Sequence, residues 1–373
     1  MLIVADENMP RVGEYFANWG ELRLLPGRAI TAEIVREADL LLVRSVTRVG
    51  RELLENSRVR FVGSATIGTD HLDTAWIENN GIAWCAAPGC NAVSVAEYVV
   101  AVVAHLRRRR GWLTGSRPRA GVIGAGNVGS RVAERLNLLG FEVFLNDPPR
   151  AAREPGFRSL PLEELRNLDL LCLHAPLERA GPWPSYHLVG EELLSRQKSD
   201  TVILSAGRGE VLDCAALKSA GRQLAWCLDV WEPEPSVDRD VLARAEIATP
   251  HVAGYALQAR WRGTSMVHAQ AARFFKRPEL VLPPAVAPPV LTLERLNGWE
   301  DAVLAVYDPE KDTRTTKAAL GPLADPTARG QAFDRLRREY PDRHEFGFPL
   351  LRVIQEPEPA QAELLRRLSF RFQ

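Results

Sequence analysis

The stretch GVIGAGNVGSRVAERLNLLGFEVFLND, residues 121–147, limits the possible folds more than any other part of the chain. A short apolar run leads into a turn with three glycines, and a second apolar run ends at an acid, Asp147. Between the two runs, apolar residues recur at helical spacing, at Val128, Val132, Leu136 and Leu139. The stretch therefore predicts a strand, a tight turn, a helix and a second strand, which together form the βαβ unit of a dinucleotide-binding domain.

The glycines and the acid each have a physical role in such a unit. Gly124 and Gly126 let the backbone turn tightly and approach a pyrophosphate, whose charge the helix N-terminus stabilises. The Asp147 carboxylate accepts hydrogen bonds from ribose hydroxyls and repels a 2′-phosphate, which favours NAD, although nearby Arg150 leaves NADP as an alternative. The residues expected to bind the cofactor here are Gly124, Gly126, Asn127, Val128, Gly129 and Asp147.

Short apolar runs alternate with amphipathic stretches over residues 1–276, which is typical of βαβ units with parallel sheets. We predict an α/β fold with two Rossmann-like or flavodoxin-like doubly wound domains, and a helix over about residues 93–109. The proline-rich residues 277–290 predict an extended linker to a small α+β domain. The predicted domains are a substrate-binding domain over residues 1–92, completed by about 257–280, an NAD-binding domain over 93–256, and a C-terminal domain over 281–373.

Composition excludes several classes of function. The 47 basic and 47 acidic residues cancel, so no strong field would attract nucleic acid or a membrane surface, and we expect neither as a partner. The five cysteines form no CxxC pair, so we expect no metal site and a reducing, cytoplasmic location. The N-terminus lacks the basic start of a signal peptide, and no apolar run is long enough to span a bilayer.

Three chemically active segments follow the nucleotide motif at the ends of predicted strands: SAGRGEVLD, LDVWEPEP and TPHVAGY. His251 suits the removal of a hydroxyl proton during oxidation of a secondary alcohol, and a carboxylate beside it would stabilise its protonated form. The Arg208 guanidinium would bind a substrate carboxylate through two parallel hydrogen bonds. His71 and His174 are alternative bases, but neither lies in a comparable segment.

These segments resemble those of the D-isomer-specific 2-hydroxyacid dehydrogenases. The resemblance implies a catalytic set of Arg208, Glu234 and His251, with Glu234 chosen over Glu232 because the family acid directly precedes a proline, here Pro235. Two positions depart from the family, with Ala175 in place of a threonine and Gly207 where a cysteine is common. The further cofactor contacts that the resemblance implies are Ala175, Ala206, Gly207, Arg208, Asp229 and Gly254.

The resemblance also implies a small-molecule substrate, a phosphorylated 2-hydroxy acid. It places substrate contacts at Ser45, Thr66 and Tyr255. The segment LLVRSVT adds Arg44 as a candidate phosphate ligand, although a solvated loop charge is the alternative. The C-terminal domain resembles a dimerisation domain, which implies a homodimer. The alternative functions are oxidation of another substrate, such as phosphoglycerate, glycerate or hydroxypyruvate, and NAD sensing by a non-enzymatic regulator.

Overall fold

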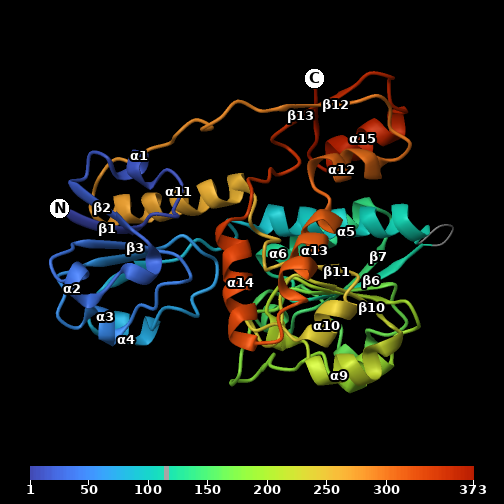
Figure 1. The fold of residues 1–373 in the computed structure, drawn as a ribbon, viewed down its shortest axis with the longest axis horizontal. Coiled ribbons are helices and arrows are strands. Elements are labelled where there is room, and N and C mark those ends of the chain that lie inside the picture. The colour runs from blue at the N-terminus through green and yellow to red at the C-terminus, as the bar shows by residue number, and fades with distance from the viewer. Residues whose placement is uncertain (113–116) are drawn as a thin grey trace. The chain divides into compact units, whose positions relative to one another are not determined.

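The computed structural model describes residues 1–112 and 117–373, which divide into two compact units. Residues 1–91 and 256–287 form the first unit, and residues 92–255 and 288–373 form the second (Figure 1).

The first unit is built on a five-stranded sheet with the order β2-β1-β3-β4-β5 and all pairings parallel. This is the flavodoxin-type order, which requires a right-handed crossover between successive strands. Its strands are β1 (Leu2–Asp6), β2 (Glu21–Leu25), β3 (Leu40–Val43), β4 (Phe61–Ser64) and β5 (Ala83–Cys85). Its helices are α1 (Val12–Phe16), α2 (Ala32–Val35), α3 (Arg51–Leu54), α4 (Thr74–Asn79) and α11 (Leu257–Phe274), with a 3₁₀ turn at Gly27–Ala29.

Helix α11 completes this unit although it is distant in sequence. A Cβ atom added at Gly63 in β4 would lie 2.4 Å from Val267 of α11. A Cβ added at Gly263 in α11 would lie 3.0 Å from the carbonyl oxygen of Ala65. The two glycines therefore let the helix pack closely on β4, where any larger residue would force the layers apart.

The second unit contains a six-stranded parallel sheet with the order β11-β10-β9-β8-β6-β7. Its strands are β6 (Arg119–Ile123), β7 (Glu142–Asn146), β8 (Leu170–Leu173), β9 (Val202–Ser205), β10 (Ala225–Leu228) and β11 (Ile247–Ala248). Its helices are α5 (Ala92–Arg110), α6 (Asn127–Leu138), α7 (Pro148–Arg153), α8 (Glu191–Ser195), α9 (Cys214–Ser219) and α10 (Arg239–Arg244), with 3₁₀ turns at Leu162–Glu164, Gly209–Val211 and Ala220–Gln223. The strand order reverses at β6, and a ligand of an open α/β sheet binds at the carboxyl edge beside such a reversal.

The C-terminal segment adds a small parallel sheet with the order β12-β13-β14. Its elements are β12 (Val290–Leu293), α12 (Trp299–Val306), α13 (Pro309–Leu320), α14 (Pro326–Arg338), β13 (Leu350–Val353), α15 (Pro359–Arg367) and β14 (Arg371–Phe372). Its apolar residues do not form a separate core, because Ala302, Val303 and Phe346 pack in one cluster with residues of α5.

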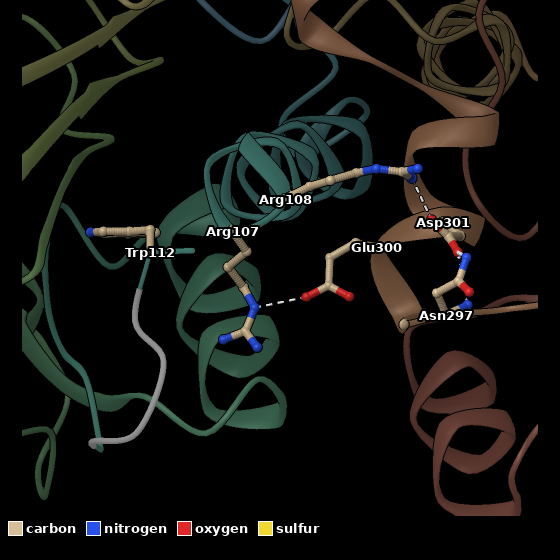
Figure 2. Close-up of a pocket in the computed structure, with 7 residues that line it drawn as sticks. Arg107, Arg108, Trp112, Asn297, Glu300 and Asp301 are labelled. Carbon is tan, nitrogen blue, oxygen red and sulfur yellow. Dashed lines mark hydrogen bonds and ion pairs between the residues drawn. The ribbon is translucent and has the colours of Figure 1, made fainter. Parts of the chain in front are cut away.

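Ion pairs reinforce this junction where α5 ends. Arg107 donates to Glu300 at 2.7 Å, and Arg108 pairs with Asp301 (Figure 2). The two pairs line a cavity of about 270 Å³ together with Trp112. The arginines at the end of α5, which oppose the negative end of the helix dipole, thus also bind the C-terminal segment.

The structure confirms the predicted fold class of two doubly wound parallel-sheet domains with a small additional α+β part. The helix expected over residues 93–109 spans Ala92–Arg110. None of the helices in the described part of the chain combines the length and apolarity required to cross a bilayer. The domain boundaries and the dimerisation role of residues 281–373 stay predictions.

Candidate functional site

The glycine turn lies at the carboxyl end of β6 and opens helix α6. Gly124 has a φ of 84°, and a Cβ there would lie 2.5 Å from the backbone nitrogen of Ala175. A Cβ at Gly129 would lie 1.9 Å from the Gly124 carbonyl oxygen, so the helix packs tightly on the turn. Gly126 differs because no atom lies within 4 Å of its added Cβ, and both Gly126 and Asn127 are exposed. The helix N-terminus therefore faces open space that a phosphate group can enter.

Asp147 follows β7, at the same edge of the sheet, and caps helix α7. Its carboxylate accepts the N–H of Arg150 at 2.9 Å and the N–H of Ala125, inside the glycine turn, at 2.8 Å. The Arg150 guanidinium pairs with Glu154 at 2.7 Å and donates to the Ala125 carbonyl oxygen at 2.7 Å. Since this guanidinium already has protein partners, the arrangement favours an unphosphorylated ribose beside Asp147.

Strands β8 and β9 bring the next candidates to this edge. Ala175 follows β8, and Ala206, Gly207 and Arg208 follow β9. A Cβ at Gly207 would approach the backbone of residues 173–175 to 3.1 Å, so the two loops pack closely. Arg208 is half-buried, and its Nη1 donates to the Gly207 carbonyl oxygen at 3.1 Å.

His251 and Glu234 form a hydrogen-bonded pair. Nδ1 of His251 lies 2.7 Å from Oε1 of Glu234, and the two side chains are 31% and 23% exposed. Burial alone would raise the pKa of Glu234, but the charge of His251, its hydrogen bond and the charge of Arg337 lower this pKa below 4.5. Because Nδ1 contacts the carboxylate, Nε2 is the nitrogen with which the ring can exchange a proton.

Asp229 shapes the loop that carries His251. Its carboxylate accepts the hydroxyl of Thr249 at 2.6 Å and the N–H groups of Val252 and Ala253 at 2.8 Å and 3.0 Å. The His251 N–H donates to the Asp229 carbonyl oxygen at 2.8 Å. These bonds hold His251 at a φ of 58°, a left-handed conformation that is strained for a residue with a Cβ.

The surroundings of Asp229 also shift the pKa of its carboxyl group. Burial raises its pKa, and the charge of His251 and the bonds from the loop oppose this rise. Since both carboxylate oxygens already accept bonds from the loop, Asp229 organises the site in this structure, and its expected contact with the cofactor stays a prediction.

The two alternative histidines lie in different environments. His174 follows β8 and is half-buried, but both of its ring nitrogens are buried, and within the described part of the chain neither has a hydrogen-bond partner. Burial lowers its pKa to about 3, so the ring stays neutral and is a poor proton acceptor at physiological pH. His71 lies in the first unit, where Nε2 contacts the hydroxyl of Ser64 at 2.9 Å. Among the three candidate bases, His251 alone combines partial exposure with a carboxylate partner at the carboxyl edge of the second sheet.

The first unit carries the other substrate candidates, also at carboxyl ends of strands. Arg44 and Ser45 follow β3, and Thr66 follows the neighbouring strand β4. Ser45 is exposed, while the Thr66 hydroxyl lies 2.7 Å from that of Ser64. Nη1 of Arg44 donates to the Asn8 carbonyl oxygen at 3.3 Å. Their binding of substrate stays a prediction that rests on this placement.

The sequence reasoning missed a residue of helix α14. Nη1 of Arg337 lies 3.9 Å from Oε1 of Glu234, and its guanidinium lies 5.6 Å from the ring centre of Tyr255. Tyr255 also packs edge to face with Tyr340, 6.0 Å away between ring centres. The sequence offered no signal for these contacts, because α14 lies far along the chain in a segment without catalytic motifs.

Comparison with known proteins identifies the family. Residues 101–253 match the family described as D-isomer specific 2-hydroxyacid dehydrogenase, NAD binding domain. The erythronate-4-phosphate dehydrogenase of Azotobacter vinelandii is 46% identical over 381 residues, with 99% of each chain covered. The enzyme of the same name from Marinobacter nauticus is 43% identical over 358 residues, which cover 92% of this chain and 93% of that relative. The chain belongs to the erythronate-4-phosphate dehydrogenases.

Solved structures share the fold at lower sequence identity. The NAD⁺-bound 3-phosphoglycerate dehydrogenase of Entamoeba histolytica is 22% identical, has a TM-score of 0.62, and covers 74% of this chain and 95% of its own. The D-lactate dehydrogenase of Aquifex aeolicus, solved with NAD and lactic acid, is 23% identical, has a TM-score of 0.59, and covers 74% of this chain and 96% of its own. These similarities confirm the fold class.

As an erythronate-4-phosphate dehydrogenase family member, the chain is an NAD-dependent oxidoreductase. The residues of the second unit fit the cofactor. Gly126 and Asn127 expose the start of α6 for the pyrophosphate, and the acceptor-only carboxylate of Asp147 suits a ribose diol. Ala175 offers no side-chain hydroxyl, so a bond to NAD at this position would have to use the backbone.

Among the described residues, one cluster in the second unit could hold a metal ion by its residue types: His187, Asp213 and Glu232. Protein groups already bind these side chains. His187 contacts Glu232 at 2.6 Å, Glu232 accepts the N–H of Cys214 at 3.1 Å, and Asp213 caps helix α9. These hydrogen bonds account for the cluster without an ion.

Proposed function

We propose that this protein catalyses the NAD-dependent oxidation of 4-phospho-D-erythronate to (R)-3-hydroxy-2-oxo-4-phosphooxybutanoate, a step of pyridoxal 5′-phosphate (vitamin B6) biosynthesis. The observation that carries the proposal is the similarity over nearly the whole chain to relatives named for this activity. The Glu234–His251 pair at the carboxyl edge of an NAD-binding domain gives the reaction a chemical basis.

His251 is the proposed general base. When bound, NAD⁺ accepts the hydride from C2 of the substrate. Nε2 of His251 takes the proton of the C2 hydroxyl, and Glu234, bound to Nδ1, orients the ring and stabilises the imidazolium that forms. The ionised state of Glu234, which its lowered pKa favours, supports this role.

Arg208 is the proposed ligand of the substrate carboxylate and of the C2 oxygen. Its strand, β9, lies beside β10, which in turn pairs with β11 before His251. A guanidinium can bind a carboxylate through two hydrogen bonds and polarise the developing carbonyl.

The terminal phosphate requires a cationic or amide-rich cradle. We assign this role to Arg44 and Ser45, with Thr66 and Tyr255 as further substrate contacts. Arg44 supplies the positive charge and Ser45 an exposed hydroxyl at the end of the same strand.

Two wider expectations belong to the same proposal. The C-terminal segment would mediate a homodimer, as its resemblance to a dimerisation domain implies. The protein would act in the cytoplasm, where its five free cysteines stay reduced.

A substrate panel followed by NADH absorbance at about 340 nm tests the proposal, with 4-phospho-D-erythronate beside 3-phosphoglycerate, glycerate and hydroxypyruvate. We expect 4-phospho-D-erythronate to give the highest kcat/KM. A higher value for another member of the panel would reassign the substrate. Binding of NAD without turnover of any 2-hydroxy acid would favour a regulator. For the phosphate, Arg44→Ala should reduce the preference for the phosphorylated over the dephosphorylated substrate, and an unchanged ratio would place the cradle elsewhere.

A further inference from the structure

Helix α14 brings a positive charge to the Glu234–His251 pair. Nη1 of Arg337 lies 3.9 Å from Oε1 of Glu234, the same oxygen that contacts Nδ1 of His251 at 2.7 Å. The Arg337 side chain is only 19% exposed. In the described part of the chain its Nε is buried without a hydrogen-bond partner. A guanidinium is costly to bury, so its place beside one carboxylate requires an explanation.

The packing of α14 holds this charge in place. Arg329, two turns earlier in the helix, donates through Nε to the Val237 carbonyl oxygen at 2.6 Å. A Cβ added at Gly330 would lie 3.4 Å from the Pro235 ring and 3.3 Å from the Ser236 hydroxyl. The helix therefore packs on the three residues that directly follow Glu234, and the loop and α14 position one another.

The remaining surroundings keep Arg337 charged. Burial alone would lower its pKa, but electrostatic interactions with Tyr255, Glu234 and Asp229 and a hydrogen bond with Tyr255 raise this pKa above its ordinary value. Its guanidinium also lies 5.9 Å from the ring centre of Phe333, one turn earlier in α14. Arg337 thus joins Glu234, the carboxylate that orients His251 in the proposed function, and Tyr255, a proposed substrate contact.

We infer that Arg337 is a positioning residue of the proton-transfer pair, because its guanidinium lies beside the same Oε1 of Glu234 that contacts His251. This inference rests on the proposed function, which gives the pair its role. The titratable groups that face the pair are Asp229, which interacts with His251 and Arg337, and Tyr255, which interacts with Arg337. A cation beside this carboxylate competes with the imidazolium for Oε1, so Arg337 weakens the ion pair between Glu234 and protonated His251.

The pH dependence of the reaction tests this charge effect. In Arg337→Met, the acidic limb of kcat/KM should move to higher pH by about one unit, because the unopposed Glu234 carboxylate stabilises the imidazolium. Arg337→Lys should return the limb toward its wild-type position. Arg338 provides a matched control on the same helix, since it is 63% exposed and pairs with its neighbour Glu339 at 3.5 Å. Arg338→Met should leave the profile unchanged, whereas a purely structural role of Arg337 would lower kcat/KM equally at every pH.

An NMR titration separates this inference from the substrate assignment. The ring-carbon signal of His251 in ¹³C-histidine-labelled protein is identified by its absence in His251→Gln. Its titration midpoint should move upward by about one unit in Arg337→Met, with or without a known substrate. If the midpoint moves but 4-phospho-D-erythronate is not oxidised, only the proposed function fails. If it does not move in a variant with a wild-type melting temperature, the inference is overturned. Arg337→Gln replaces Arg337→Met should the latter fail to fold.

Discussion

The segment WEPEP contributes the glutamates of two histidine–glutamate pairs, Glu232 and Glu234. Glu232 lies 2.6 Å from Nε2 of His187, and Glu234 lies 2.7 Å from Nδ1 of His251. The two hydrogen bonds are nearly the same length, and both histidines are 31% exposed. Their surroundings differ, and the difference separates a structural pair from a catalytic one.

The Glu232–His187 pair ties peripheral loops together. Glu232 also accepts the N–H of Cys214, where α9 begins, and His187 stacks on Tyr186 with ring centres 3.9 Å apart. The Glu234–His251 pair instead lies at the carboxyl end of β11, with Arg337 at its carboxylate and Asp229 bound to its loop. Distance alone does not define a proton-transfer pair, because the charges and the sheet edge around it decide its chemistry.

Removal of the two imidazoles should give the largest contrast. His251→Gln should lower kcat by about 10³-fold, because the reaction loses its general base. His187→Gln should keep kcat within about threefold of wild type, since this ring lies outside the proposed proton path. Steady-state kinetics measure kcat for both variants. NADH fluorescence checks that each variant still binds the cofactor. Comparable losses in the two variants would contradict the distinction.

Exchange of the two carboxylates should give the next largest contrast. Glu234→Gln should lower kcat by about 10²-fold, because the imidazolium loses its stabilising charge, while Glu232→Gln should change kcat little. A pKa below 4.5 means that the Glu234 carboxylate stabilises the fold above that pH and loses this contribution as the pH falls through its lowered pKa. The stability gap between wild type and Glu234→Gln should therefore close under acid, as urea denaturation at several pH values would show.

Glu97 sharpens the comparison because it is a carboxyl group without a histidine partner. It lies in α5, where Oε2 accepts the Phe346 N–H at 2.8 Å. Burial, assisted by the charge of Glu345, raises its pKa from 4.5 to about 8. A raised pKa means that this group contributes stability fully below pH 4.5 and loses the contribution as the pH rises through about 8.

Glu97→Gln should remove the loss of stability that ionisation of Glu97 causes as the pH rises. Relative to wild type, the variant should gain about 4 kcal/mol of unfolding free energy between pH 4.5 and about pH 8, because glutamine keeps an acceptor without a charge. Urea midpoints of the two proteins measure the gap. A gap that stays constant across this range would show that Glu97 does not titrate as stated.

The smallest expected effect concerns stability at the structural pair. Glu232→Gln weakens its bonds to His187 and Cys214, so it should reduce the unfolding free energy by about 1 kcal/mol. Thermal melts of wild type and Glu232→Gln test the expected loss of stability. Measurements of kcat on the same two proteins test whether turnover stays nearly unchanged. A loss of kcat without a loss of stability would assign Glu232 a role in catalysis.

The sequence predicted the parallel-sheet domains because strand and helix periodicities are local properties of the chain. It also located the glycine turn, Asp147 and His251, because each follows a strand at the edge where ligands bind such sheets. Glu234 and Glu232 were separable only through the family resemblance, since both precede a proline in the same segment. Periodicity could not show that α5 shares its core with the C-terminal segment.

What the sequence determined by itself was therefore the order of elements and the residue types at the strand ends. Only the tertiary structure decided that Oε1 of Glu234 faces both His251 and Arg337, since Arg337 lies 86 residues after His251 and 103 residues after Glu234 in the sequence. It also decided that the ring nitrogens of His174 are buried, which lowers the pKa of this histidine, while His251 has a carboxylate beside it. Charges and burial act through space, so the chemistry of this site depends on contacts that the chain order does not contain.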